Sequence, residues 1–344
     1  MTMLTESMTF IIPGELNAAS PPEKRGIRRD HVKLLSIDRK TGRSEHTSFY
    51  RIDQYLKEGD LLVLNNSRTI PAILKGSLKR SFHTIEDAVE VRLAHRKNGW
   101  VWEALIVSEK MKKGDRLVFS DFLAAEIIFL DAKKPLQTIT FNLKGTDLWN
   151  AIYQLGEPVR YEYVKLPWEL EYYQTVYASV PGSVEMPSAG RAFSWELLFR
   201  LQEKGVKIAY LQLHTGLSYY LDDKWKPDPS GNHEEYFIPE KTLQSVLKAK
   251  SAGGRVIAVG TTVVRALETA AITRNLKGWT NLYVHSDFKL NMTNGIITGL
   301  HEPEASHLDM LSAFLPKEKL FKAYHEAVRE NYLWHEFGDM NLIV

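Results

Sequence analysis

The sequence contains no cysteine among its 344 residues. It therefore cannot form disulfides, supply a thiolate nucleophile, or bind zinc or an iron–sulfur cluster through cysteine. Histidine is plentiful, with 11 residues, but no two histidines have the H-x-x-x-H spacing of a metal site on a helix. We therefore predict that the protein binds no metal.

Long apolar runs are also absent. No stretch approaches the roughly 20 apolar residues that a membrane-spanning helix requires. The first residues, MTMLTESMTFIIPGEL, lack the basic segment and the long apolar core of a secretory signal. We expect a cytoplasmic protein without membrane contact.

Charge of one sign is not in large excess, since 44 basic and 42 acidic residues leave a formal net charge of +2. Any contact with nucleic acid would then depend on a local basic patch. One candidate lies near the N-terminus and contains Arg25, Arg28 and Arg29. Runs of charge more often form a solvated face, so both interpretations stay open for this cluster.

The chain is long enough for two domains with separate cores. Between about 72 and 158, short β-type segments at 86–95, 100–108, 116–130 and 137–143 alternate with turns, and Lys97-Asn98-Gly99 is a hairpin signal. This texture predicts a small β-barrel or sandwich.

Beyond Tyr173 the pattern changes to alternating helices and strands. We predict helices over 195–204, 239–250, 262–272 and 317–331, and strands over 206–213, 255–259 and 280–284. Together with short buried strands at 32–37 and 60–64, this gives an α/β main domain. We predict a discontinuous α/β catalytic domain of residues 1–71 and 159–344, with an inserted small β-barrel domain over 72–158.

The most informative stretch runs from Tyr173 to His214. A loop rich in small residues precedes a helix that Ser194 caps, and a strand then ends at His214. In open α/β sheets, ligands bind where such loops meet strand carboxyl ends. Imidazole can accept or donate a proton near neutrality, which makes His214 a candidate base or acid. An ordinary surface loop is the alternative.

Small residues near this histidine are candidates for cofactor contact because they allow close backbone approach: Gly182, Ser183, Ser188 and Gly190. A second candidate is Gly260-Thr261-Thr262, which follows one strand and opens a helix, as a carboxylate site would. Arg265, one helical turn later, could pair with that carboxylate or only with Glu268.

Several long blocks resemble a known family. YQTVYA at 173–178, GSVEMPSAGRAF at 182–193 and LHTG at 213–216 are similar to its YQTVYA, GSVAAPTAGLHF and LHVG. GDLLVLNNSRTIPAILKG at 59–76, VIAVGTTVVRALET at 256–269, IITGLHEPEASHLDMLSAF at 296–314 and GDMNLI at 338–343 match further blocks in the same order. The chain is identified as a member of the S-adenosylmethionine:tRNA ribosyltransferase-isomerase family (the QueA family).

The resemblance implies a late step of queuosine biosynthesis. S-adenosylmethionine would donate a ribosyl group to 7-aminomethyl-7-deazaguanine at the tRNA wobble position, giving epoxyqueuosine, adenine and methionine. It implies His301 as a second proton-handling residue, and His233 with Glu235 as a catalytic pair whose carboxylate orients or charges the imidazole; a polar loop pair is the alternative. Asn66 and Arg68 form a polar stop after the strand at 60–64 and are candidates for contact with the substrate or RNA. Arg68 could bind a phosphate or carboxylate, or form only a structural salt bridge. S-adenosylmethionine is then a substrate, tRNA is the partner, and we expect a monomer or weak oligomer.

The chain departs from the family inside these motifs. Asn66 replaces Asp, Arg191-Ala192 replace Leu-His, and Gly299 replaces Asn. Further changes are Ser218-Tyr219-Tyr220 for Gly-Thr-Phe, His285-Ser286 for Pro-Gly, and a missing histidine near Gly231. Two alternatives therefore stay open: a diverged S-adenosylmethionine- or nucleoside-binding transferase with another acceptor, and a non-catalytic RNA-binding protein.

Overall fold

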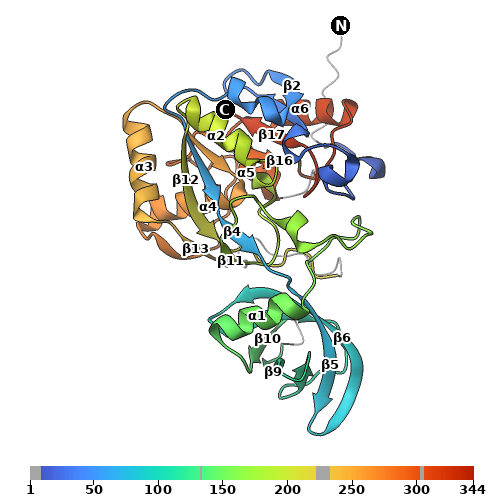
Figure 1. Cartoon of the computed structure of the whole chain (residues 1–344). Coiled ribbons are helices and arrows are strands. Elements are labelled where there is room, and N and C mark those ends of the chain that lie inside the picture. The colour runs from blue at the N-terminus through green and yellow to red at the C-terminus, as the bar shows by residue number, and fades with distance from the viewer. Residues whose placement is uncertain (1–8, 132–133, 222–232, 303–305) are drawn as a thin grey trace.

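The computed structural model describes residues 9–131, 134–221, 233–302 and 306–344. It shows a large α/β part with a smaller β-barrel attached to it (Figure 1). The predicted fold class, an α/β domain with an inserted barrel, is confirmed. No helix within the described ranges is both long and apolar enough to cross a bilayer.

In the described part of the chain, one mixed sheet of nine strands forms the larger part. Its order is β15 (Lys277–Thr280), β13 (Glu234–Phe237), β12 (Lys207–Leu213), β3 (Leu61–Asn65), β14 (Val256–Val259), β16 (Gly295–Gly299), β17 (Met340–Ile343), β1 (Lys33–Ile37) and β2 (Ser44–Ser48). The central strands β12, β3, β14 and β16 are mutually parallel. Their carboxyl ends therefore share one edge of the sheet.

Both faces of this sheet are buried, as parallel sheets require. Leu62 and Leu64 of β3 point into one core, together with α2 (Trp195–Glu203). Leu61 and Val63 point to the other face. That face is covered by α3 (Glu240–Ser251), α4 (Thr261–Thr273), α5 (Ser306–Leu311) and α6 (Lys317–Arg329).

The barrel is closed by six strands within the described residues: β5 (Ile73–Arg80), β6 (His83–Arg96), β7 (Val101–Ile106), β8 (Arg116–Val118), β9 (Ala124–Phe129) and β10 (Leu136–Phe141). Helix α1 (Gly145–Leu155) packs on it, with Trp149 edge-on to Trp102 at 6.1 Å between ring centroids. Our boundaries at 72 and 158 stay a proposal. Backbone hydrogen bonds of 2.9 Å join Ile73 to Glu157 where the chain enters and leaves the barrel.

Local signals placed most elements well. The Ser194 hydroxyl accepts a hydrogen bond from the amide of Leu197 at 3.1 Å, so the predicted cap of α2 is confirmed. The segment 116–130 is two strands instead of one, and helix α1 was not predicted. A strand over 280–284 is wrong: β15 ends at Thr280, whose hydroxyl accepts the amide of Leu282 at 3.1 Å and turns the chain.

Asn65 ties three of these elements together at the end of β3. Its Oδ1 accepts the amides of Leu213 and Ser67, both at 3.1 Å. Its Nδ2 donates to the Leu213 carbonyl at 2.8 Å and to Thr262 Oγ1 at 3.4 Å. One buried side-chain amide therefore aligns the ends of β3 and β12 with the first turn of α4.

We predict that Asn65→Ala lowers the free energy of unfolding by about 2–4 kcal/mol, because it leaves buried backbone groups of Leu213 without partners. Urea denaturation measures this difference. Asn142→Ala is the matched control, since the exposed Asn142 amide also makes two backbone bonds, to Ala124 and Phe122, each 2.8 Å. Equal losses in the two variants would contradict the role given to Asn65.

Candidate active site at the domain junction

The sequence motifs converge at the carboxyl edge of the central sheet. His214 follows β12, Asn66 follows β3, Gly260 follows β14, and His301 follows β16 by two residues. These strands are neighbours in the order β12-β3-β14-β16. Along the chain, β3 is followed by β12, its neighbour on one side in the sheet. The later strand β14 is added on the opposite side of β3, so the order in which strands are added reverses direction between β3 and β14. Such a reversal is the usual ligand position in open α/β sheets.

A chain of hydroxyl groups fixes the His214 ring. His214 Nδ1 lies 2.7 Å from Ser67 Oγ, which lies 2.6 Å from Ser183 Oγ. The backbone amide of Thr215 donates to Ser183 Oγ at 3.1 Å, so this series of hydrogen bonds ends at a backbone donor. Burial, with the nearby Arg96 charge, lowers the pKa of His214 to about 4. His214 is therefore uncharged at neutral pH and can accept a proton.

Gly182 permits this ring position. Its φ is +155°, and a Cβ at this position would lie 2.5 Å from His214 Nδ1. Any side chain would therefore displace the imidazole. We predicted that small residues here allow close approach of the backbone, and at Gly182 the backbone does lie close to the ring of His214, a catalytic candidate.

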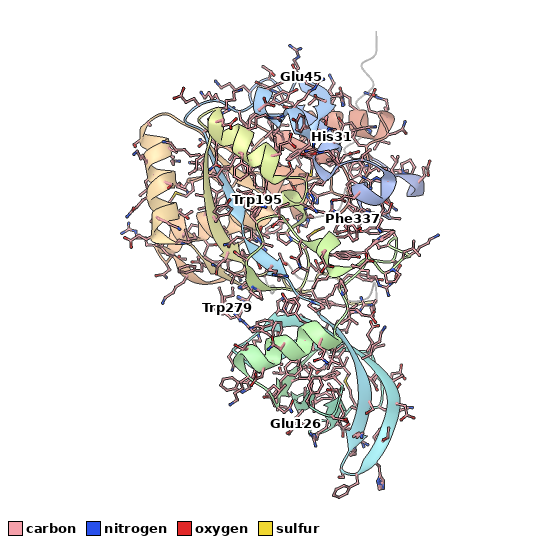
Figure 2. All side chains as sticks on the ribbon, viewed as in Figure 1. His31, Glu45, Glu126, Trp195, Trp279 and Phe337 are labelled. Atoms are coloured by element: carbon pink, nitrogen blue, oxygen red, sulfur yellow. The ribbon has the colours of Figure 1, made fainter. Side chains whose placement is uncertain are left out.

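Residues of both domains line a small hollow beside His214, about 10 Å³ in volume, which we call the junction pocket. Its lining is Ala94, His95, Arg96, Gly182, His214, Thr215, His233, Glu234, Glu235 and Trp279. Figure 2 shows Trp279 at the boundary between the two parts. The structure thus brings together four predicted residues, Gly182, His214, His233 and Glu235.

Glu235 does not orient His233, contrary to our expectation for this pair. Its carboxylate pairs with Arg96 of the barrel at 2.6 Å, and no bond joins it to His233 in the described residues. The reason is that strand β13 directs Glu235 toward the barrel, while His233 precedes the strand and is exposed. Gly216 also serves the junction, since a Cβ there would lie 2.2 Å from His95 Nε2.

Arg265 is committed to the buried carboxylate of Glu234, with which it forms an ion pair. Burial lowers the pKa of Arg265 to about 10. The alternative partner Glu268 is wrong, because its carboxylate accepts the amides of Asn291, Met292 and Thr293 at 2.7 to 3.0 Å. Glu234 also accepts the Gly216 amide at 3.2 Å, which links Arg265 to the junction pocket.

The two predicted cofactor loops meet above β14. Gly260 has φ +98° and precedes Thr261, the first residue of α4. A Cβ on Gly260 would lie 3.3 Å from that of Ala189, so the short turn Ser188–Gly190 lies against it. The first amides of a helix have no partner within the helix and favour an anion. The hydroxyl of Thr262 already accepts a bond from Asn65.

His301 belongs to a second group of uncharged rings. It stacks on His307 with ring centroids 4.3 Å apart, and its Nε2 lies 2.8 Å from Thr298 Oγ1. Burial holds the pKa of His301 well below its usual value and, with the Arg265 charge, lowers that of His307 to about 4. The His307 side chain is nevertheless reachable by solvent.

A further group lies near His301, and no sequence motif predicted it. Tyr163 stacks on His335 at 4.4 Å, and its hydroxyl donates to Glu336. Burial raises the pKa of Glu336 to about 7. His335 has φ +72°, a left-handed conformation that is uncommon for residues other than glycine and often occurs at functional sites. Burial lowers the pKa of His335, and a charge on His335 would in turn lower the pKa of His301, so the two histidines lie close enough to interact.

Two departures from the family motifs pair with each other. Glu185 stands where the family motif has alanine, and Ser218 where it has glycine. The Ser218 amide donates to Glu185 at 2.6 Å, and its hydroxyl lies 2.9 Å from both carboxylate oxygens. Burial raises the pKa of Glu185, whose charge in turn acts on Tyr161. One departure therefore compensates for the other.

The remaining departures fall outside this arrangement or leave space in it. Arg191 is buried and donates to the Tyr172 carbonyl and to Glu23, both at 2.7 Å, so it serves the core. A Cβ at Gly299 would meet only the His335 carbonyl oxygen at 3.8 Å, so the missing asparagine side chain leaves open space. His285 is exposed, and Gly231 lies outside the described residues.

The arginines predicted at RNA already have internal partners. Arg25 donates to the Phe337 carbonyl at 3.1 Å, and Arg29 pairs with Glu23 at 3.1 Å. Arg28, whose side chain is 52% exposed, pairs with Asp30 and Glu196. Phosphate binding by these residues stays a prediction, and Arg28 is the most accessible of them.

The two predicted substrate contacts after β3 diverge. The Asn66 amide donates to Ser179 Oγ at 3.1 Å, and its Oδ1 is buried without a hydrogen-bond partner. Arg68 is exposed and lies over the Tyr153 ring at 5.7 Å, without an ion pair to a described residue. A structural salt bridge, our alternative for Arg68, is therefore not seen in the described chain.

Fold and site together define an α/β protein that carries a barrel insertion and places candidate proton-handling histidines at the carboxyl edge of its sheet. A family model, the queuosine biosynthesis protein, matches residues 5–343. The chain is 37% identical to the S-adenosylmethionine:tRNA ribosyltransferase-isomerase of Carboxydothermus hydrogenoformans and 35% to that of Sulfurihydrogenibium sp., each over 99% of this chain and 100% of the relative.

A solved structure agrees. The crystal structure of S-adenosylmethionine tRNA ribosyltransferase from Thermotoga maritima matches with a TM-score of 0.55 and 28% identity, over 98% of this chain and 99% of that one. The chain belongs to the queuosine biosynthesis protein family. The resemblance stated from its motifs is confirmed.

We predict that His214→Ala and His301→Ala each reduce turnover at least a hundredfold while the fold is retained, because general acid–base groups contribute such factors. Steady-state kinetics measure the loss, and circular dichroism checks the fold. His83→Ala, at an exposed position in β6, is the control and should keep full activity. Near-normal rates in both site variants would show that the assignment is wrong.

Glu336 generates a prediction about pH. Burial raises its pKa from the ordinary glutamate value of 4.5 to about 7, so the folded state binds the proton more tightly than the unfolded state. Stability should therefore fall as pH rises from about 4.5 to about 7 and then level off. Glu336→Gln removes this term, so its stability relative to the native chain should rise over the same window.

Chemical denaturation between pH 4 and pH 8.5 measures this difference. Glu330→Gln, at the exposed end of α6, is the reference for loss of a surface carboxylate. A stability difference between Glu336→Gln and the native chain that does not change with pH would contradict the prediction.

Proposed function

We propose that the chain is an S-adenosylmethionine:tRNA ribosyltransferase-isomerase. It transfers and isomerises the ribosyl group of S-adenosylmethionine onto 7-aminomethyl-7-deazaguanine at the wobble position of tRNA. The products are epoxyqueuosine in tRNA, adenine and methionine. The observation that carries this proposal is the convergence of the family's motifs at the carboxyl ends of four adjacent strands, in a chain that belongs to the family.

His214 is the proposed base. The sulfonium charge of the donor acidifies the adjacent carbon, and an uncharged imidazole can take the proton from it. The bonds to Ser67 and through it to Ser183 hold the ring in one orientation, which preorganises the transfer. Glu234 and Glu235 line the same pocket, but each is paired with an arginine, Arg265 and Arg96, so the proposal gives them no free charge for the donor.

The donor's methionine carboxylate fits the N-terminus of α4. Gly260, Thr261 and Thr262 open this helix, and the turn containing Ser188 and Gly190 lies against it. Arg265 supplies positive potential nearby but keeps Glu234 as its partner. We therefore assign carboxylate binding to the helix amides ahead of the arginine.

His301 is the proposed partner of the departing adenine. Burial and the neighbouring His307 and His335 lower the pKa of His301, so its ring is uncharged. In the proposal, this neutral ring binds adenine through a hydrogen bond. The stacked pair His301–His307 offers a flat surface of the kind that holds nucleobases.

The acceptor tRNA would approach across the junction, where Asn66 and Arg68 lie close to Ser67. Arg25, Arg28 and Arg29 are the proposed phosphate contacts farther away. We place the enzyme in the cytoplasm as a monomer or weak oligomer, with S-adenosylmethionine as a substrate and no metal. In the described residues, no group of three or more metal-ligating side chains is present.

Label transfer tests the proposed reaction. We expect radiolabel in the ribosyl carbons of S-adenosylmethionine to enter tRNA bearing 7-aminomethyl-7-deazaguanine, with one adenine released per label. Label in the methyl group should not enter, and tRNA with unmodified guanine is the control. Adenine release without ribosyl transfer, or methyl transfer in its place, would contradict the proposal.

A further inference from the structure

A second hollow lies where the two connections between the domains cross. Its lining, which we call the hinge pocket, is Pro71, Tyr153, Gly156, Glu157, Pro158, Arg160, Pro167, Trp168, Glu169 and Leu170. Its cavity volume is about 240 Å³, and it is open to solvent. This is a little below the roughly 300 to 1,000 Å³ of sites that enclose small ligands, which often lie at domain boundaries.

The floor of the hinge pocket is held rigidly. The chain passes here twice, and Ile73 and Glu157 exchange two backbone hydrogen bonds of 2.9 Å. A Cβ at Gly156 would lie 2.1 Å from the Pro71 carbonyl oxygen, so glycine is required for this contact. Three prolines in the lining restrict the backbone further. The hollow is therefore preformed.

The lining combines aromatic faces with cations that lack acidic partners. Tyr153 and Trp168 are partly exposed rings in the lining. Arg160 makes no hydrogen bond or ion pair with any other residue in the described ranges. Arg68 lies over the Tyr153 ring, and Lys24 Nζ lies 5.7 Å from the centroid of Trp168.

The acidic residues do not cancel this charge. Glu157 is already paired with Lys75 at 2.6 Å, and Glu169 is the other carboxylate of the lining, with no side-chain partner among the described residues. Tyr173 adds a polar group nearby, since its buried hydroxyl has no hydrogen-bond partner and its pKa is influenced by the Arg160 charge. Aromatic faces beside unpaired arginines are the usual recognition elements for an unpaired nucleotide.

One short strand joins the hinge pocket to the catalytic residues. In β4 (Ser67–Thr69), the buried Ser67 bonds to His214, while the adjacent exposed Arg68 reaches Tyr153. Neighbouring residues of a strand point to opposite sides. A polynucleotide with one base at His214 could therefore place an adjacent nucleotide across the strand in the hinge pocket.

We propose that the hinge pocket binds one unpaired nucleotide of the acceptor RNA next to the nucleotide that is modified. Its base stacks on Tyr153 or Trp168, and its phosphate contacts Arg160 and Arg68. This inference rests on the proposed function, because it assumes that RNA is the acceptor. It adds a specificity contact away from the reacting atoms.

Binding of an anticodon stem–loop RNA by the full chain tests the inference. Tyr153→Leu and Arg160→Ala should each weaken binding about tenfold, the usual scale for a lost base stack or a lost phosphate contact. Tyr153→Phe keeps the ring and should bind normally. Matched controls in the barrel are Phe129→Leu and Arg116→Ala, both at exposed positions.

The RNA is then altered in the same assay, with an abasic site at each loop position in turn. For the native chain, an abasic site at one position beside the modified nucleotide should weaken binding. For Tyr153→Leu, the same abasic site should cause no additional loss, because both changes remove the same stacking contact. Additive losses at every position would overturn the inference. So would normal binding by Tyr153→Leu and Arg160→Ala.

The outcomes separate this inference from the proposed function. If the native chain transfers the ribosyl label but the hinge-pocket variants bind all RNAs normally, the function stands and the hinge pocket has no role in RNA binding. If the native chain neither binds the stem–loop nor transfers label, both proposals fail. A nucleoside monophosphate that binds as tightly as the stem–loop would identify a mononucleotide site and overturn the RNA assignment.

Discussion

The side-chain amide of Asn65 is the interaction on which the arrangement of the site depends. It satisfies both backbone groups of Leu213, the amide of Ser67 and the hydroxyl of Thr262. These residues lie in the three segments that carry His214, the bonded serines Ser67 and Ser183, and the first turn of α4. An apolar residue at this position could fill the space but could not set the relative positions of the three segments, because only the hydrogen bonds do so.

Close approach of backbone and ring is the second constraint. Two glycines make room for two histidines, Gly182 for His214 and Gly216 for His95. The second contact joins the α/β part to the barrel, and the ion pair of Arg96 with Glu235 adds to it. The junction pocket therefore forms only when both parts of the chain are folded and packed together.

The electrostatics of the site follow from this packing. Three histidines at the carboxyl edge of the sheet, His214, His301 and His307, are kept uncharged by desolvation, while the buried Arg265 is matched by Glu234. At the junction pocket Arg96 is likewise matched by Glu235, so the site combines neutral rings with paired charges. The low polarity that lowers these pKa values also strengthens each hydrogen bond to a bound substrate.

Much of the fold was predictable because its signals are local. The Ser194 cap, the hairpin at Lys97–Gly99 and the apolar runs of β3 and β14 each depend on a few adjacent residues. The parallel strand ends then account for the meeting of distant motifs such as those of His214 and Gly260. Helix α1 was missed because its apolar face is short and lies within a β-rich segment.

The rest of the site depends on contacts between residues far apart in the sequence. Ser67 gains its role from a ring 147 positions away, and Glu336 from the hydroxyl of Tyr163, 173 positions away. The basic cluster of Arg25, Arg28 and Arg29 also depends on distant contacts, since Arg28 pairs with Glu196 and Arg25 donates to the Phe337 carbonyl. Composition shows the charges but not their partners.

A crystal structure of the complex with S-adenosylmethionine tests the location of the active site most directly. The account predicts that the carbon beside the sulfonium lies within proton-transfer reach of the His214 ring, with the donor carboxylate at Gly260–Thr262. A donor bound elsewhere, with the junction pocket empty and His214 still bonded only to Ser67, would contradict it.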